Sequence, residues 1–257
     1  MHIFIKNTLT FQTKIISFAQ IIITLTTVWV RNHSKNRFLF IDIRMKTFLR
    51  FLLLILLAGT LAHCNISKPK KTIEDLRTAF NNESTSSEKY AKFAQKATSE
   101  GFDTISKLFE AASKSENIHA VNHGKVLEKY GKNNGPADIG TYEVKTTAEN
   151  IQDAIKSETY ELQTMYPAFI KDAENEKTPE AAQSFTWAWD AEKKHLNYYR
   201  MAIASITKEN GTGLPYTWYV CPLCGNTYNL NDIKANCDFC LTKQENFIGY
   251  AENPIGQ

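Results

Sequence analysis

Acidic residues are almost absent from the first quarter of this 257-residue chain. Residues 1–63 contain one acid, Asp42, against eight Lys and Arg, whereas residues 64–257 contain 26 acidic and 22 basic residues. The overall charge of +3 therefore comes from the amino-terminal segment, and the rest of the chain is mildly acidic. The rest also lacks a stripe of Lys and Arg with interleaved aromatics, so we expect no nucleic-acid binding.

Proline and glycine are scarce as well, with 7 and 11 residues. This excludes a collagen-like or low-complexity chain, and the apolar fraction of 43% is ordinary for a globular protein. The 194 residues after the basic segment suffice for one core and one small module. A Gly-rich dinucleotide fingerprint is missing, so electrons from a nicotinamide would have to come through a separate reductase.

The segment from Met45 has the order of an export signal. A basic stretch (45–50) precedes an apolar run (51–58) that is shorter than the ~20 residues of a membrane span, and small residues lead to Cys64. This ending resembles a lipoprotein signal, although His63 replaces the usual small residue. Lipidation of Cys64, cleavage near Ala62 and retention as an anchor all stay open. We expect an exported protein of the periplasm or cell envelope, attached to a membrane if Cys64 is lipidated.

Residues 1–44 fit no such scheme, because polar residues interrupt their apolar stretch (15–30). We expect translation to start at Met45 and residues 1–44 to be absent from the native product. We therefore expect residues 1–44 to be an extension and residues 45–64 to be the signal.

Four stretches of the remaining chain repeat apolar residues with helical spacing. The first is expected to begin with Thr72 as its N-cap, Pro167 is expected to kink the third, and Pro179 opens the fourth. A long connection (131–147) separates the second helix from the third, while the other connections are short. This pattern predicts a mainly α protein with a ferritin-like four-helix bundle over residues 72–210.

Each of the four apolar helix faces carries carboxylate or imidazole groups. They are Glu83 on the first helix, Glu116 and His119 on the second, Glu158 and Glu161 on the third, and Glu192 and His195 on the fourth. Carboxylates that converge in a bundle repel one another, and burying one without a partner costs several kcal/mol. Because no Lys or Arg shares these faces, bound metal cations are the simplest compensation.

The spacing of these groups sharpens the prediction. Glu116-x-x-His119 and Glu192-x-x-His195 each place two side chains on one helix face, and a Glu from each other helix completes the di-iron carboxylate pattern. His123 follows His119 by one turn and is a further candidate ligand, although the set is complete without it. Two tyrosines lie near these turns and either pack and hydrogen-bond there or take a redox or proton role. These are Tyr90 and Tyr166.

Four of the five cysteines lie near the carboxyl end. Cys221 and Cys224 form one CxxC pair, and Cys237 and Cys240 form a second after twelve residues. Two such pairs are typical of a tetrahedral four-cysteine metal site, which we expect to staple a small domain over residues 215–257. Thiolates suit Fe or Zn, so a structural zinc ribbon stays open as the alternative.

Together these motifs resemble the rubrerythrin family, in which a rubredoxin-like four-cysteine domain follows a ferritin-like di-iron bundle. The resemblance covers about Thr72–Ile248 and includes the seven carboxylate and imidazole residues, both CxxC pairs and Met165-Tyr166-Pro167. Two positions depart from the family pattern: Asp238 stands where Pro is usual, and Leu241 where Gly often follows. These departures bear on the redox potential of the four-cysteine metal, not on its ligation.

The resemblance implies a non-haem di-iron peroxidase that reduces hydrogen peroxide to water. By this resemblance, Glu116 and Glu158 bridge two irons, Glu83 binds one of them, and Glu192 with His195 binds the other. It further implies that Glu161 and His119 are alternative ligands to the first iron.

The resemblance also implies that one iron on the four cysteines relays electrons from an external donor or reductase. A homodimer is expected, in which a neighbouring subunit brings this iron to the bundle. Two alternatives stay open: an iron-oxidising or iron-handling protein, and a non-enzymatic metal-binding lipoprotein with Zn on its cysteines.

Overall fold

The computed structural model describes residues 68–132, 134–206 and 213–251. The expected extension (1–44) and signal (45–64), with Cys64, lie outside the described residues, as do residues 207–210 and 252–257 at the ends of the two expected domains. Among the described helices, none combines the length and apolar character that a membrane span requires.

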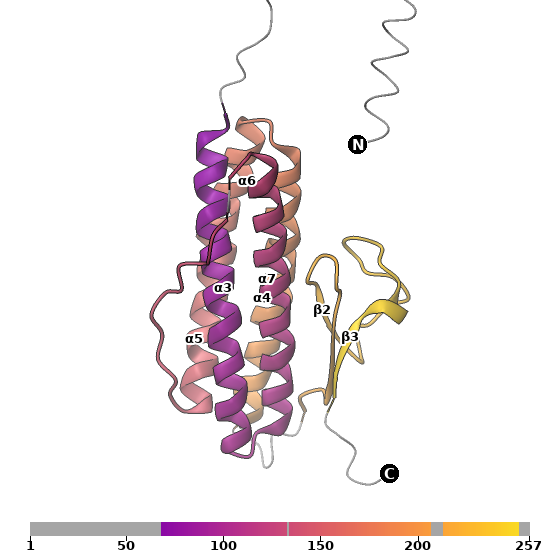
Figure 1. Cartoon of the computed structure of the whole chain (residues 1–257). Helices are drawn as coiled ribbons and strands as arrows, with labels where there is room; N and C mark the ends of the chain where they lie inside the picture. The colour runs from indigo at the N-terminus through magenta and orange to yellow at the C-terminus, as the bar shows by residue number, and fades with distance from the viewer. Residues whose placement is uncertain (1–67, 133, 207–212, 252–257) are drawn as a thin grey trace, which may run out of the picture. The chain divides into compact units, whose positions relative to one another are not determined.

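The described helices form the predicted ferritin-like bundle (Figure 1). They are α3 (Lys70–Ser99), α4 (Asp103–Lys129), α5 (Thr147–Tyr160), a π-helical turn η1 (Glu161–Met165), α6 (Tyr166–Asn175) and α7 (Pro179–Ile206). The long crossover between α4 and α5 runs along α3, where Gly140 N donates to Thr85 Oγ1 over 3.0 Å. A capping box of Thr146 and Glu149 then starts α5.

Two local predictions need correction. Helix α3 begins at Lys70, and Thr72 is not its N-cap: its buried hydroxyl lies 3.2 Å from Thr178 Oγ1, so it joins two chain segments instead. Pro167 lies in the first turn of α6, where a missing N–H costs nothing. The irregularity precedes it as the turn η1, and π-helical turns of this kind often lie at functional sites.

The bundle interior contains two apolar clusters with polar residues between them along the helices. On α4, Phe109 belongs to one cluster and Leu127 to the other. On α7, Tyr199 and Phe185 are divided in the same way. The predicted carboxylates lie in sequence between these cluster members, so a polar layer crosses an otherwise apolar core.

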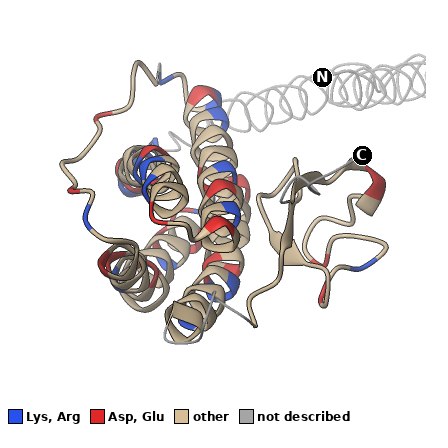
Figure 2. Cartoon of the chain, turned by 90° about the horizontal axis from the view of Figure 1, so that it is seen from below, with Lys and Arg blue, Asp and Glu red and all other residues tan. Residues whose placement is uncertain are grey.

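The carboxyl-terminal domain is a three-stranded antiparallel sheet in the order β2-β1-β3. Its strands are β1 (Thr217–Val220), β2 (Thr227–Asn229) and β3 (Ile248–Ala251). Trp218 and Val220 of β1 pack into one of the apolar clusters of the bundle, and the ring centroids of Trp218 and Tyr198 are 4.8 Å apart. The sheet therefore shares a core with the bundle, and it lies beside α4 and α7 in both views (Figures 1 and 2).

Both signs of charge are interspersed along the helices (Figure 2). Many of these charges form short-range pairs on the surface, such as Lys193 with Asp190 and Lys107 with Glu110. Pairs of this kind contribute at most about 1 kcal/mol each, so the surface explains little of the fold. The unusual charges are those in the interior.

Candidate metal centres

The bundle brings all seven predicted carboxylate and imidazole residues into its interior, and each is at most 1% exposed. Six of them form two groups whose ligand atoms lie within 4.8 Å of one another. The first group contains Glu83, Glu116, His119 and Glu192, and the second contains Glu116, Glu158, Glu192 and His195. Because Glu116 and Glu192 belong to both groups, the geometry offers two adjacent metal positions with shared carboxylates.

The two histidines present the same ring atom to these positions. His119 Nδ1 lies 3.0 Å from Glu116 Oε2 and 3.1 Å from Glu192 Oε1. His195 Nδ1 lies 2.6 Å from Glu192 Oε2 and 3.3 Å from Glu116 Oε1. Each imidazole therefore aims Nδ1 at a cluster of oxygens, as a metal ligand does. His195 Nε2 bonds to Thr227 outside the cluster, whereas His119 Nε2 is buried without a hydrogen-bond partner.

Glu161 lies outside both groups. Glu161 belongs to the turn η1, and its Oε1 accepts a hydrogen bond of 2.9 Å from Asn82 Nδ2. The two predicted tyrosines hold other carboxylates: Tyr90 OH donates to Glu158 Oε1 over 2.7 Å, and Tyr166 OH donates to Glu83. The structure thus gives both tyrosines a hydrogen-bonding role at the site.

Burial makes the site electrostatically costly. It raises the pKa of Glu83, Glu158 and Glu161 well above the ordinary value of a carboxyl, and the neighbouring glutamates raise it further. For Glu116, burial acts in the same direction, but His195 and His119 outweigh it and lower the pKa. The two histidines therefore compensate only part of the negative charge of the buried carboxylates.

Unpaired ligand atoms support the metal interpretation directly. One oxygen of each of the five glutamates is buried without a hydrogen-bond partner; these are Glu83 Oε2, Glu116 Oε1, Glu158 Oε2, Glu161 Oε2 and Glu192 Oε1. Native proteins rarely leave such atoms unsatisfied, because each costs about 1–3 kcal/mol or more when charged. Two divalent cations would satisfy the oxygens of the four glutamates in the ligand groups and compensate their charge, so the residues present fit a di-metal cofactor.

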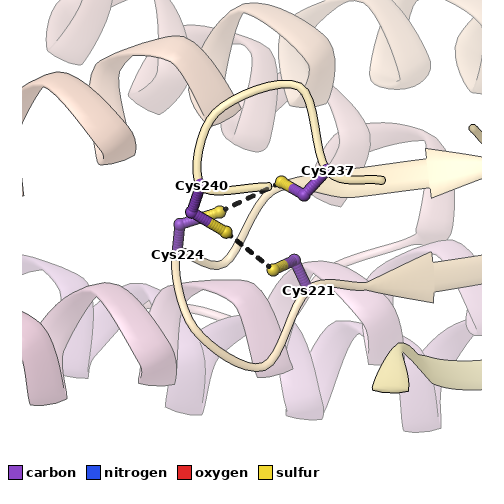
Figure 3. A group of neighbouring side chains, drawn as sticks. All are labelled: Cys221, Cys224, Cys237 and Cys240. Carbon is purple, nitrogen blue, oxygen red and sulfur yellow. Dashed lines mark hydrogen bonds between the residues drawn. The ribbon is translucent and has the colours of Figure 1, made fainter. Parts of the chain in front are cut away.

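The four predicted cysteines also come together (Figure 3). Cys221 Sγ lies 3.4 Å from Cys240 Sγ, and Cys224 Sγ lies 3.5 Å from Cys237 Sγ. These distances are far longer than the ~2.05 Å of a disulfide, and all four thiols are free. Such a spacing suits four thiolates around one metal ion.

The two unusual residues of the second CxxC pair have defined local roles. The Asp238 N–H donates to Tyr228 OH over 2.8 Å, and Tyr228 OH in turn lies 3.4 Å from Cys237 Sγ. Leu241 adopts a φ of 62°, in the left-handed region that favours glycine. The backbone therefore keeps the turn that glycine would make and carries a leucine in it.

The four-cysteine domain touches the di-metal site of its own chain. Ser115 Oγ donates to Gly225 O over 2.5 Å, and Thr227 Oγ1 lies 2.9 Å from His195 Nε2. Gly225 has a φ of 82°, and a Cβ at this position would lie 2.4 Å from His119 Nε2. Distance along the chain suggested delivery by a neighbouring subunit, but the fold brings the two centres together within one chain.

Sequence reasoning missed several residues around the site. Ser184 is a buried polar residue two turns before Glu192, a signal that could have identified it, whereas Asn82 is only half-buried beside Glu83 and gave no such signal. Gly225 and Thr227 follow the first CxxC pair and gave no such signal, because their partners lie on distant helices. His123 joins neither ligand group.

Comparison with known proteins agrees with this geometry. The sequence model of the rubrerythrin family matches residues 74–203. Rubrerythrin-2 of Clostridium acetobutylicum is 31% identical over 183 residues, which cover 71% of this chain and 98% of that protein. Nigerythrin of Nitratidesulfovibrio vulgaris is 29% identical over 180 residues, covering 70% and 86%. The solved structure of fully reduced nigerythrin matches with a TM-score of 0.63 and covers 70% of this chain and 86% of that one.

Proposed function

Because the chain belongs to the rubrerythrin family and carries that family's di-iron site, we propose that it reduces hydrogen peroxide to water. The observation that carries the proposal is the pair of ligand groups that share Glu116 and Glu192. Two ferrous ions bound there would supply the two electrons that, with two protons, convert one hydrogen peroxide into two waters.

The residues of the chain hold and orient this site. His119 offers Nδ1 from α4 and His195 offers Nδ1 from the neighbouring α7, and Tyr90 donates to one oxygen of Glu158. We further propose that Glu161 and His119 exchange as ligands to one iron. In the structure His119 belongs to a ligand group, whereas Glu161 lies outside it and is hydrogen-bonded to Asn82. The π-helical turn places Glu161 beside the group, and this position supports such an exchange.

Electrons enter, in this proposal, through iron on the four cysteines. The contact between Gly225 and His119 supports this route, because Gly225 directly follows the thiolate of Cys224 and touches a di-iron ligand. A zinc ion on the same cysteines would fill the site but carry no electron. The external donor or reductase has to reach this domain from outside the bundle.

We also propose export of the protein and lipid attachment at Cys64, from the signal-like order of residues 45–64. A homodimer, as the family resemblance implies, belongs to the same proposal. We also propose that translation starts at Met45; mass spectrometry of the native amino terminus tests this, since a peptide from residues 1–44 would contradict it. Equilibrium sedimentation of the purified protein tests the dimer.

The decisive experiment for the activity uses iron-loaded protein, reduced without oxygen. Hydrogen peroxide is added in known amounts, and its consumption is measured together with the visible spectrum. We expect one peroxide consumed per oxidised di-iron site and rapid oxidation of the four-cysteine iron. A reduced protein that survives peroxide without oxidising would refute the enzyme function. Zn on the cysteines would leave that domain colourless, and oxidation of added Fe²⁺ by O₂ without peroxide turnover would favour iron handling.

A further inference from the structure

His123 is the one imidazole of the described residues that belongs to neither ligand group. It is fully buried on α4, where it contacts the ring of Phe185 at a centroid distance of 5.3 Å. An apolar residue would pack at this place without any need for partners, whereas a buried imidazole costs free energy unless both ring nitrogens are hydrogen-bonded. The hydrogen-bond partners of its two ring nitrogens should therefore explain why His123 is buried here.

Both nitrogens of His123 have partners. Nδ1 lies 2.8 Å from Ser184 Oγ on α7, and Nε2 lies 3.2 Å from Tyr166 OH on α6. Tyr166 OH in turn donates its hydrogen bond to Glu83 on α3. The result is a continuous chain of three side chains that crosses the bundle and ends at a ligand of the first metal group.

The chemistry of these groups fixes the direction of the chain. A metal-bound carboxylate is an acceptor only, so Tyr166 must spend its single hydroxyl proton on Glu83. The tyrosine oxygen then accepts from His123 Nε2–H, which leaves Nδ1 as an acceptor for the hydroxyl of Ser184. Burial lowers the pKa of His123 to about 3, so the ring is neutral and has one donor and one acceptor, as this chain requires.

The corresponding carboxylate of the third helix is held differently. Glu158 accepts from Tyr90, but the ring of Tyr90 packs among aromatic residues, with Phe109 at 5.9 Å and Tyr199 at 5.6 Å between centroids. Each tyrosine thus donates a hydrogen bond to one carboxylate ligand. Tyr166 differs because His123, which is bonded to Ser184, in turn orients its hydroxyl. The two metal positions are therefore inequivalent beyond their direct ligands.

We propose that Ser184 and His123 are positioning residues that orient Tyr166 and, through it, Glu83, and that they thereby strengthen metal binding at the position containing Glu83 over the position containing Glu158. Partners of this kind typically change metal affinity by about 10- to 100-fold. The proposal rests on the di-iron site of the family and not on the proposed peroxidase activity, so it survives if the activity fails.

The test is an anaerobic titration with Co²⁺ of protein whose four cysteines already bind Zn²⁺ and whose bundle is free of metal, followed by its d–d absorption. We expect two resolved binding steps in the unaltered protein. In His123→Leu and Ser184→Ala, one step should weaken by at least about 10-fold while the other stays within about twofold. Tyr90→Phe should weaken the other step. Ser205→Ala removes a buried hydroxyl of the same helix α7 that donates to Ala202 O, and it should change neither step.

Two further measurements keep the proposal falsifiable if His123→Leu folds poorly. His123→Gln keeps a donor and an acceptor and should recover part of the affinity. Nitrogen-15 NMR of the protein with diamagnetic Zn²⁺ in both centres, where Glu83 is a metal-bound acceptor, should show His123 as the neutral Nε2–H tautomer, with mixed tautomers in Ser184→Ala. Equal weakening of both steps, no weakening of either, or an Nδ1–H tautomer in the unaltered protein would each overturn the proposal.

Discussion

The two metal centres of this protein are built in opposite ways. The four cysteines come from a segment of 20 residues, Cys221–Cys240, and two tight turns bring them together. The carboxylates and imidazoles are spread from Glu83 to His195 over the helices of the bundle and meet only when the helices pack. One centre is thus organised by local chain geometry and the other by tertiary structure.

The two centres also differ in what they require of the metal. Free thiols are tolerable in a small domain core, since they behave as weakly polar groups. Buried carboxylates with unpaired oxygens are not, because each carries a desolvation cost that only a proton or a cation removes. We therefore expect the metals to stabilise the bundle by compensating the charge of its carboxylates. In the four-cysteine domain we expect the metal to stabilise the fold by linking the four thiolates.

The largest effect should come from Glu116→Gln. Glu116 belongs to both ligand groups, so its loss should abolish iron binding in the bundle and leave only the iron of the four cysteines. Iron analysis should fall from three ions per chain to one, while the visible bands of the thiolate-bound iron persist. Glu128→Gln, an exposed change on the same helix, serves as the control.

The reciprocal variant Cys224→Ser should lose the thiolate bands and keep two iron ions in the bundle. If either variant emptied both centres, the separation of a local site from a tertiary one would be wrong.

The second prediction concerns pH and metal removal. In the metal-free protein, the pKa is raised for three carboxyls and two imidazoles: Glu83, Glu158, Glu161, His119 and His195, the last to about 9. Groups with a raised pKa stabilise the fold below their unfolded pKa and lose this contribution as pH rises. The metal-free bundle should therefore become less stable between about pH 5 and 9.

Two glutamates have a lowered pKa, Glu116 and Glu192, but their contribution is lost only below the ordinary carboxyl pKa, outside this interval. Denaturant unfolding followed by far-UV circular dichroism measures the trend. The stabilisation by added Fe²⁺ should grow over the same interval, because metal displaces protons from its ligands. A metal-free stability that rises with pH would contradict the assignment.

A third prediction addresses the contact between the centres. In Gly225→Ala, the new methyl group would collide with His119, and overpacking of this kind costs about 1–3 kcal/mol. We expect lower stability and slower oxidation of the four-cysteine iron after peroxide is added, measured by stopped-flow absorption. Gly101→Ala is a matched control, since Gly101 has a similar φ of 79° but no atom within 4 Å of the added Cβ. Equal effects of the two variants would mean that backbone strain alone is responsible.

The smallest effect should come from Leu241→Gly. Leu241 is 75% exposed and holds a left-handed conformation, which costs a non-glycine residue about 1–2 kcal/mol. Glycine should stabilise the four-cysteine domain by about 1 kcal/mol, since little burial is lost. Thermal loss of the thiolate–iron bands provides the measurement. Leu230→Gly, at an exposed position without a positive φ, should stabilise nothing.

Much of the bundle could be predicted because its signals are periodic. The Glu-x-x-His pairs and the apolar spacing identify which residues face inward, since both depend only on the helix repeat. The π-helical turn was not predicted, because the shift of about 100° that one inserted residue causes in the repeat falls within Glu161–Met165, where only two apolar residues mark that repeat. The same holds for the sharing of Glu192 by both ligand groups, which depends on how α7 rotates against its neighbours.

The partners of the ligands were the least predictable part. His123 shares a stripe with His119 and is, from the sequence, a candidate ligand that the complete set does not need; in the structure it bonds to Ser184 and Tyr166. Nothing in the order of residues distinguishes these outcomes, because both place a polar ring inside the bundle. Only the identity of the atoms that face it on α6 and α7 decides.

The kinds of site in this protein follow from residue type and spacing, which specify along one helix or one turn which side chains point the same way. The tertiary structure alone decided which of these groups meet, which carboxylates are shared, and that the four-cysteine domain rests on His119 and His195 of its own chain. The physical reason is that spacing sets direction within an element, whereas contact between elements depends on packing along the whole length of the helices.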